Sequence, residues 1–93
     1  MPVPQFVWNP QKAALNKSKH GIDFQQAATV FFDPLLLLIP DLAHSDREER
    51  WIALGKSSEQ LLLVVVHTED ELTIRIISAR KATSHERKAY ESG

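Results

Sequence analysis

The residues best suited to chemistry lie on two apolar segments that follow one another in the second half of the chain. His67 and Glu69 end the first segment, and Arg75 and Arg80 lie in the second, LTIRIISAR. A histidine or glutamate can take a proton from a 2′-hydroxyl, and the planar fork of arginine suits a phosphate that gains charge in the transition state. The set therefore suits metal-free cleavage of a phosphodiester.

The same side chains also have a plain structural interpretation, which their spacing alone favours. Glu69 or an acid within residues 46–49 can simply pair with Arg75, and Arg80 can mark the solvent end of a strand. On a regular strand these two arginines leave opposite faces, whereas a β-bulge near Ser78 would bring them to one face. Both arrangements stay open at this point.

Metal and cofactor chemistry have little support in the sequence. The four histidines are dispersed without metal-binding spacing, there is no cysteine, and the three glycines form no phosphate-binding loop. We therefore expect no metal and no cofactor. Tyr90 can stack on a base or pack on a sheet, and His20 can act as a base or interact with a helix C-terminus.

The elements that must position these residues can be read from periodicity, caps and breakers. Asn9 and Asp23 are expected to cap two helices, and Thr83 with Glu86 forms a capping box for a third. The expected elements are a strand at 5–8, helices at 10–19 and from 24 to about 33, a strand or connector at 35–39, strands at 50–55, 61–68 and 72–80, and a helix at 84–91.

This order predicts a single α+β domain over residues 1–93. A small antiparallel sheet would carry two N-terminal helices and one C-terminal helix, with 61–68 as its central strand because that segment is apolar on both faces. In the first helix we expect residues 13–15 to face the core and Asn16 to face solvent.

Composition bounds the function. The 93 residues are 43% hydrophobic and 25% charged, with a net charge of −1, which argues mildly against a general nucleic-acid binder. However, residues 75–88 carry five basic side chains against one acid, so a local positive field remains. The longest apolar runs are far shorter than the ~20 residues of a membrane helix, and no secretion signal is evident. We expect a cytoplasmic protein that does not enter a membrane.

Taken as a whole, the chain resembles the BrnT family of toxins from BrnT/BrnA type II toxin–antitoxin systems. The motifs that carry the resemblance are KHG-x-x-F, ERW-x-x-x-G, HTE and RIISAR, in this order and spacing. The resemblance implies a RelE-like fold and RNA cleavage that shuts down translation. It also implies a BrnA-like antitoxin with a ribbon-helix-helix segment, which neutralises the toxin in a hetero-oligomer and alone contacts operator DNA.

These considerations assign roles to ten residues. Arg80, with help from Arg75, would bind the scissile phosphate, and His20, His67 or Glu69 would handle protons. The expected RNA-binding residues are Arg50, Lys56, Lys81, Arg87 and Tyr90. Two alternatives remain, namely a non-catalytic antitoxin-binding corepressor module and an RNA-binding protein without cleavage.

Overall fold

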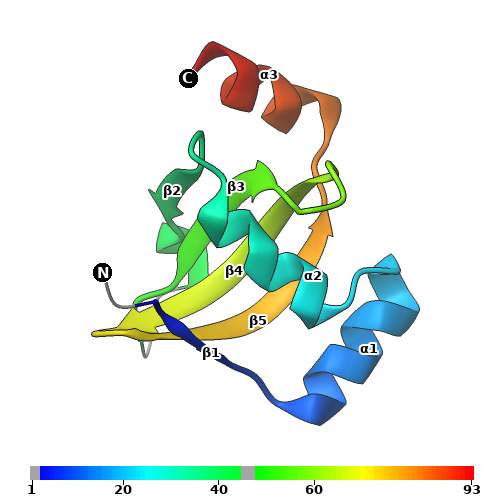
Figure 1. Cartoon of the computed structure of the whole chain (residues 1–93), viewed down its shortest axis with the longest axis vertical. Coiled ribbons are helices and arrows are strands. Elements are labelled where there is room, and N and C mark those ends of the chain that lie inside the picture. The colour runs from blue at the N-terminus through cyan, green and yellow to red at the C-terminus, as the bar shows by residue number, and fades with distance from the viewer. Residues whose placement is uncertain (1–2, 45–47) are drawn as a thin grey trace.

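A five-stranded sheet organises the computed structural model, which describes residues 3–44 and 48–93 (Figure 1). The helices and strands agree with the expected order. The elements are β1 (Gln5–Val7), α1 (Pro10–His20), α2 (Phe24–Ala28), the 3₁₀ helix η1 (Thr29–Phe32), β2 (Leu37–Pro40), the 3₁₀ helix η2 (Leu42–His44), β3 (Trp51–Lys56), β4 (Leu62–Asp70), β5 (Thr73–Lys81) and α3 (Ser84–Ser92).

The strand order is β1-β5-β4-β3-β2, so β4 is central, as predicted. Strands β2 to β5 pair antiparallel, whereas β1 pairs parallel with β5. The expectation of a wholly antiparallel sheet is therefore corrected at one edge. Consecutive strands can join through short turns, but β1 reaches its partner only after two helices and the rest of the sheet. The predicted α+β class, with two helices before the sheet and one after it, is confirmed.

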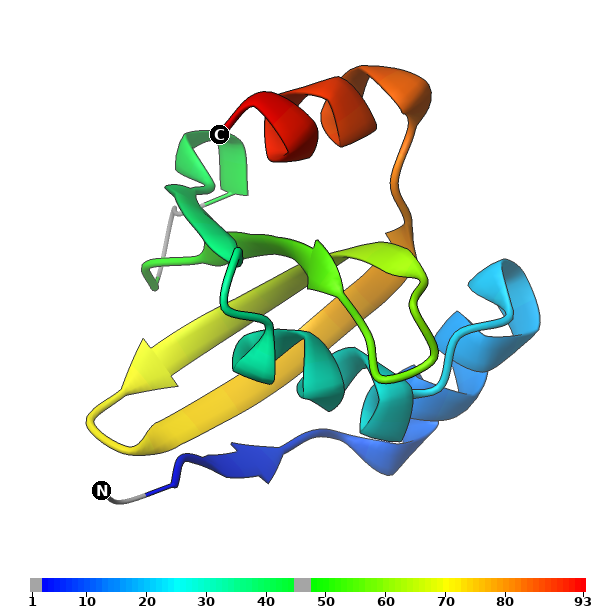
Figure 2. The same ribbon diagram turned by 45° about the horizontal axis from the view of Figure 1, so that its top comes forward.

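The main core lies between the sheet and the N-terminal helices. Phe24 and Ala27 of α2 pack against Leu63 and Val65 of β4, all of them buried. We call this the helix-covered face. A smaller cluster around Tyr90 of α3 packs on the opposite face. In Figure 2, α3 runs from the end of β5 back across the sheet toward β2, so it covers only one end of that face.

Local signals explain the helix boundaries. The side chains of Asn9 and Asp23 accept hydrogen bonds from first-turn N–H groups, and Gly21 ends α1 at a φ of 73°. The capping box of Thr83 and Glu86 is present at the start of α3. None of the described helices is long and apolar enough to cross a membrane.

The prediction for the solvent-facing side of α1 is wrong. Asn16 is buried, and its amide donates to the carbonyls of Ile22 and Ala79 while it accepts from the N–H of Ala79. Strand β1 ends at Val7, opposite Arg75, and beyond it no strand among the described residues pairs with the outer edge of β5. Asn16 takes the place of that strand and satisfies a buried backbone edge. Of the three residues expected to face the core, Ala13 is half-buried against it, whereas Ala14 and Leu15 are exposed.

Candidate active site

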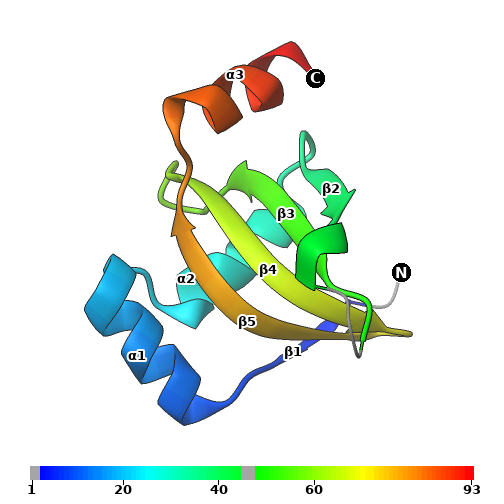
Figure 3. The same ribbon diagram turned by 180° about the vertical axis from the view of Figure 1, so that it is seen from behind.

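A β-bulge in β5 decides which side chains can act together. Val66 pairs with Ser78 but His67 pairs with Ile76, so Ile77 is the extra residue. The bulge therefore lies next to Ser78, the position near which the sequence allows one. Because it reverses the alternation, Arg75 and Arg80 leave the same face, opposite the buried Ala79. We call this the arginine face. In Figure 3 this face of β4 and β5 is turned toward the viewer, and α3 lies above one end of it.

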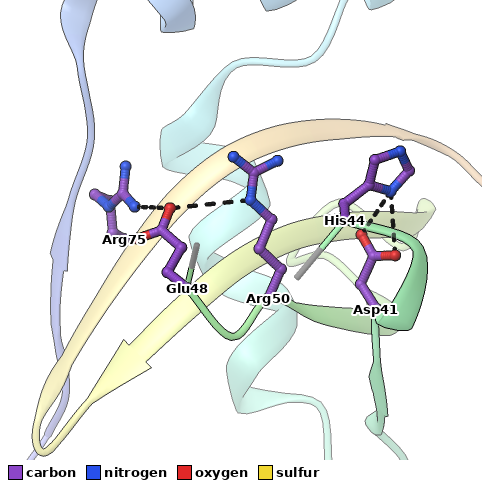
Figure 4. A network of polar contacts seen from close by, with 5 residues as sticks. All are labelled: Asp41, His44, Glu48, Arg50 and Arg75. Atoms are coloured by element: carbon purple, nitrogen blue, oxygen red, sulfur yellow. Dashed lines mark hydrogen bonds and ion pairs between the residues drawn. The ribbon is translucent and has the colours of Figure 1, made fainter. Parts of the chain in front are cut away.

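Glu48 holds two arginines at one end of the arginine face. Its Oε1 accepts a hydrogen bond of 2.5 Å from Nη2 of Arg75 and lies 3.9 Å from Nε of Arg50. Figure 4 shows the carboxylate between the two guanidinium groups. One interpretation of the sequence pairs Arg75 with an acid within residues 46–49, and Glu48 is that acid. Asp46 lies outside the described residues.

The same loop holds a histidine against a carboxylate. Nδ1 of His44 lies 3.2 Å and 3.1 Å from the two carboxylate oxygens of Asp41. The Asp41 side chain is only 9% exposed, whereas that of His44 is 68% exposed. The backbone N–H of Asp41 donates a hydrogen bond to the carbonyl of Arg50, so the histidine–aspartate pair is attached to the segment that carries Arg50. A largely exposed histidine that is oriented by a buried carboxylate is suited to proton transfer.

Arg80 is held at the other end of the arginine face. Its guanidinium makes two hydrogen bonds of 2.8 Å to the carboxylate of Glu86 in α3. This pairing raises the pKa of Arg80 and lowers the pKa of Glu86 to about 2. Arg75 and Arg80 oppose β4 residues four positions apart, Thr68 and Val64, so they are separated by about 13 Å along the strand.

The structure does not bring His67 and Glu69 to these arginines. His67 is wholly buried on the helix-covered face, where its ring packs edge-on against Phe31 at 4.7 Å. Its Nε2 lies 2.8 Å from Oε2 of Glu69. Thr68, not His67, is the partner of Arg75 in the sheet. The sheet thus separates this histidine–glutamate pair from the arginine face.

The remaining sequence-predicted residues are dispersed. His20 ends α1, beside Ser78 in a small surface cavity, and is half-buried. The side chains of Lys81 and Arg87 are exposed, and that of Arg87 lies 3.9 Å from Glu91. Among the described residues, neither side chain makes an ion pair with the loop that carries His44.

Tyr90 and Lys56 line one cavity of about 550 Å³ with Asp33, a residue not singled out from the sequence. The Tyr90 hydroxyl donates a 2.5 Å hydrogen bond to Asp33, and this bond, with burial, raises the pKa of Tyr90 to about 12. Burial opposes ionisation of Asp33, but hydrogen bonds from Lys56 N–H, Tyr90 and Leu35 N–H hold its pKa below the ordinary value. Tyr90 is therefore a packing residue in this state, which favours the second of its two interpretations.

Sequence reasoning missed Asp41, His44 and Glu48 as members of one site. The available signal was the spacing of Asp41 and His44, three residues apart and followed closely by Glu48 and Arg50. This spacing places the first pair on one side of a helical turn. Among residues 3–44 and 48–93, no three His, Cys, Asp or Glu side chains are grouped in a way that could hold a metal ion.

Comparison with known proteins gives the family. The family model described as "Ribonuclease toxin, BrnT, of type II toxin-antitoxin system" matches residues 8–86. The crystal structure of the ribonuclease toxin BrnT of Brucella abortus superimposes with a TM-score of 0.67 at 21% identity, over 87% of this chain and 99% of that one. No curated protein matches the sequence. The family match spans most of the chain and includes both arginine sites, so this protein belongs to the BrnT family of ribonuclease toxins of type II toxin–antitoxin systems.

Proposed function

We propose that this toxin is a metal-independent endoribonuclease that cuts RNA by attack of a 2′-hydroxyl on the adjacent phosphate, and that this cleavage inhibits translation. The observation that carries the proposal is the grouping of Arg50 and Arg75 around one anion. His44 belongs to the same region, because Asp41, which orients it, donates a backbone hydrogen bond to Arg50. Positioned charge and a positioned proton acceptor are the two requirements of this reaction.

Arg50 and Arg75 would bind the scissile phosphate. Guanidinium groups meet phosphate oxygens with paired, charge-assisted hydrogen bonds, and these strengthen as negative charge builds on the pentacoordinate phosphorus. Arg75 is the third residue of β5 and Arg50 directly precedes β3, so both are attached to the sheet rather than to a free loop tip. Such attachment reduces the reorganisation needed during the reaction.

His44 would take the proton of the attacking 2′-hydroxyl. If Nδ1 donates its hydrogen to Asp41, Nε2 keeps a lone pair and can accept the proton. A bond then forms between the 2′-oxygen and phosphorus, and the bond to the 5′-oxygen breaks. That oxygen takes a proton from solvent, which leaves a 2′,3′-cyclic phosphate and a 5′-hydroxyl. Asp41 acts as a positioning residue.

The other basic residues would hold the flanking RNA backbone. Arg80 lies on the arginine face about 13 Å from Arg75, and Lys81 follows it directly. Lys56 and Arg87 are exposed at the α3 end of the molecule. The buried His67 would support the sheet rather than meet RNA, because its side chain is wholly enclosed.

The partner would be a BrnA-like antitoxin with a ribbon-helix-helix segment. Membership of a type II family implies an antitoxin that binds the toxin as a protein. We propose that the two form a hetero-oligomer in the cytoplasm, that the antitoxin neutralises the toxin, and that operator DNA is contacted through the antitoxin alone.

A second candidate function rests on one observation. Arg75 and Arg80, the two arginines of β5, are each already paired with a carboxylate, Glu48 and Glu86. A face neutralised in this way would also suit a corepressor module that binds the antitoxin without cutting RNA. Producing the chain alone separates the two functions, because a corepressor leaves growth and cellular RNA intact. Salt-sensitive RNA binding without any product would instead indicate an RNA-binding protein.

The direct test is cleavage of a synthetic RNA in EDTA by the purified chain. We expect 2′,3′-cyclic phosphate ends, no reaction with the 2′-deoxy analogue, and a loss in kcat of about 10²–10⁴-fold in His44→Ala. Arg75→Ala should lose a similar factor. The control is His85→Ala, which removes an exposed histidine of α3. Full activity of folded His44→Ala, or a strict need for a divalent cation, would overturn the mechanism.

A further inference from the structure

We propose that Glu48 is an internal stand-in for the RNA phosphate, and that substrate binds by displacing this carboxylate from Arg50 and Arg75. The inference rests on the proposed function, since it concerns the same two guanidinium groups. It adds a device that lowers the affinity of the empty site for anions.

The geometry of Glu48 is that of a ligand rather than of a packing residue. A single oxygen, Oε1, serves both arginines, at 2.5 Å from Nη2 of Arg75 and 3.9 Å from Nε of Arg50. The side chain is 43% exposed, so no packed core holds it in place. Figure 4 shows it reaching from the loop into the space between the two guanidinium groups.

A phosphodiester can replace this carboxylate without a change of charge. Each carries one negative charge, but the phosphate is tetrahedral and offers two non-bridging oxygens, so it can give each arginine an oxygen of its own. Oε1 of Glu48 serves Arg75 closely and lies at the outer limit of an ion pair with Arg50. Exchange would therefore bring an anionic oxygen closer to Arg50 than Oε1 of Glu48 lies, while the freed carboxylate returns to water with little loss.

Competition of this kind has a defined kinetic signature. RNA must first displace a bound carboxylate, so its apparent affinity is reduced by the stability of that internal pair. The two partners are partly exposed, and such pairs are worth up to ~1 kcal/mol, which corresponds to a factor of about five. The penalty falls on binding, and therefore on KM, rather than on kcat.

The test measures binding of a fluorescent 2′-deoxy oligonucleotide, which cannot be cleaved, to wild type, Glu48→Gln and Glu49→Gln. Glu49 is the matched control, because it is exposed and its substitution removes the same charge from a neighbouring position. Among the described residues, its side chain makes no hydrogen bond or ion pair with Arg50 or Arg75. We expect Glu48→Gln to bind about fivefold tighter and Glu49→Gln to change affinity by less than about twofold. Circular dichroism and thermal unfolding confirm that each variant is folded.

A double-mutant cycle attributes the gain to the arginine. In an Arg75→Ala background, adding Glu48→Gln should bring little further affinity, because its main partner is gone. With cleavable RNA, Glu48→Gln should lower KM about fivefold and keep kcat within about twofold. An equal gain in Glu49→Gln, no gain in Glu48→Gln, or a gain that persists without Arg75 would overturn the inference.

The two proposals fail separately. If wild type does not cut RNA, the proposed function fails, while anion binding by the deoxy probe still tests the role of Glu48. If wild type cuts RNA in EDTA but Glu48→Gln binds no more tightly than wild type, the stand-in role fails and the ribonuclease mechanism remains.

Discussion

The ion pair between Arg80 and Glu86 should make the stability of the fold depend on pH in acid. Glu86→Gln is the informative change, because a glutamine can still accept the hydrogen bond from the N–H of Thr83 that completes the capping box. It cannot provide the negative charge that receives two 2.8 Å hydrogen bonds from Arg80. The helix cap is thus kept and the charge pair removed.

The magnitude follows from the lowered pKa of Glu86. Hydrogen bonds from Arg80 lower it from 4.5 to about 2. Because the folded value lies below the unfolded one, the carboxylate stabilises the fold above about pH 4.5, and this contribution is lost as the pH falls toward 2. Taken alone, the lowering corresponds to roughly 3.4 kcal/mol. Solvent screens the pair, since the side chains of Arg80 and Glu86 are 41% and 28% exposed, so we expect about 1–2 kcal/mol.

Urea unfolding of wild type and Glu86→Gln at several pH values measures this contribution. The variant should be less stable by about 1–2 kcal/mol at pH 7, and the difference should shrink steadily between about pH 4.5 and 2. The other carboxylates titrate in both proteins, so their contribution drops out of the difference in free energy of unfolding at each pH. A difference that stays constant down to pH 2.5, or is absent at pH 7, would refute the reasoning.

Two further predictions concern residues that hold the sheet in place. Asn16→Leu should lower the free energy of unfolding, measured in urea, by about 2–4 kcal/mol, because both backbone groups of Ala79 lose a buried partner. The control is Lys12→Leu on the exposed side of α1, and an equal loss in both variants would contradict this prediction. Tyr90 is the only tyrosine, so an absorbance titration should report its pKa alone, with a midpoint near 12 in wild type and a midpoint closer to 10 in Asp33→Asn. A wild-type midpoint near 10 would contradict the prediction that the hydrogen bond to Asp33 raises this pKa.

Local sequence signals predicted the elements well because their causes are local. Asn9, Asp23 and the Thr83–Glu86 capping box act within one helical turn, so the residues that fix each start are adjacent in sequence. The apolar run at 61–68 likewise indicated a strand buried on both faces, and β4 is the central strand. Helix 24–33 ended early as an α-helix, continuing as a 3₁₀ turn from Thr29.

Features set by distant contacts were not predictable in the same way. Asn16 looks like a solvent residue on its own helix, and becomes a core residue only because β1 is too short to cover β5 beyond Arg75. The bulge at Ile77 was one of two open possibilities, and it alone decides that Arg75 and Arg80 share a face. Twenty-seven positions separate Glu48 from Arg75, so the sequence offered a group of acids near 46–49 without choosing among them.

The pairing of arginines with carboxylates bears on an apparent conflict between the net charge and the proposed cleavage of RNA. A chain of net charge −1 lacks the general excess of basic residues common in nucleic-acid-binding proteins. Here Arg75 and Arg80 are each paired with a carboxylate from another element, the first with Glu48 of the loop and the second with Glu86 of α3. Under the proposed exchange, an RNA phosphate would displace Glu48 from Arg75, so binding would not need a general excess of basic residues. In the empty protein both arginines are paired, and the positive charge of Arg75 would become available to RNA only when the carboxylate of Glu48 is displaced.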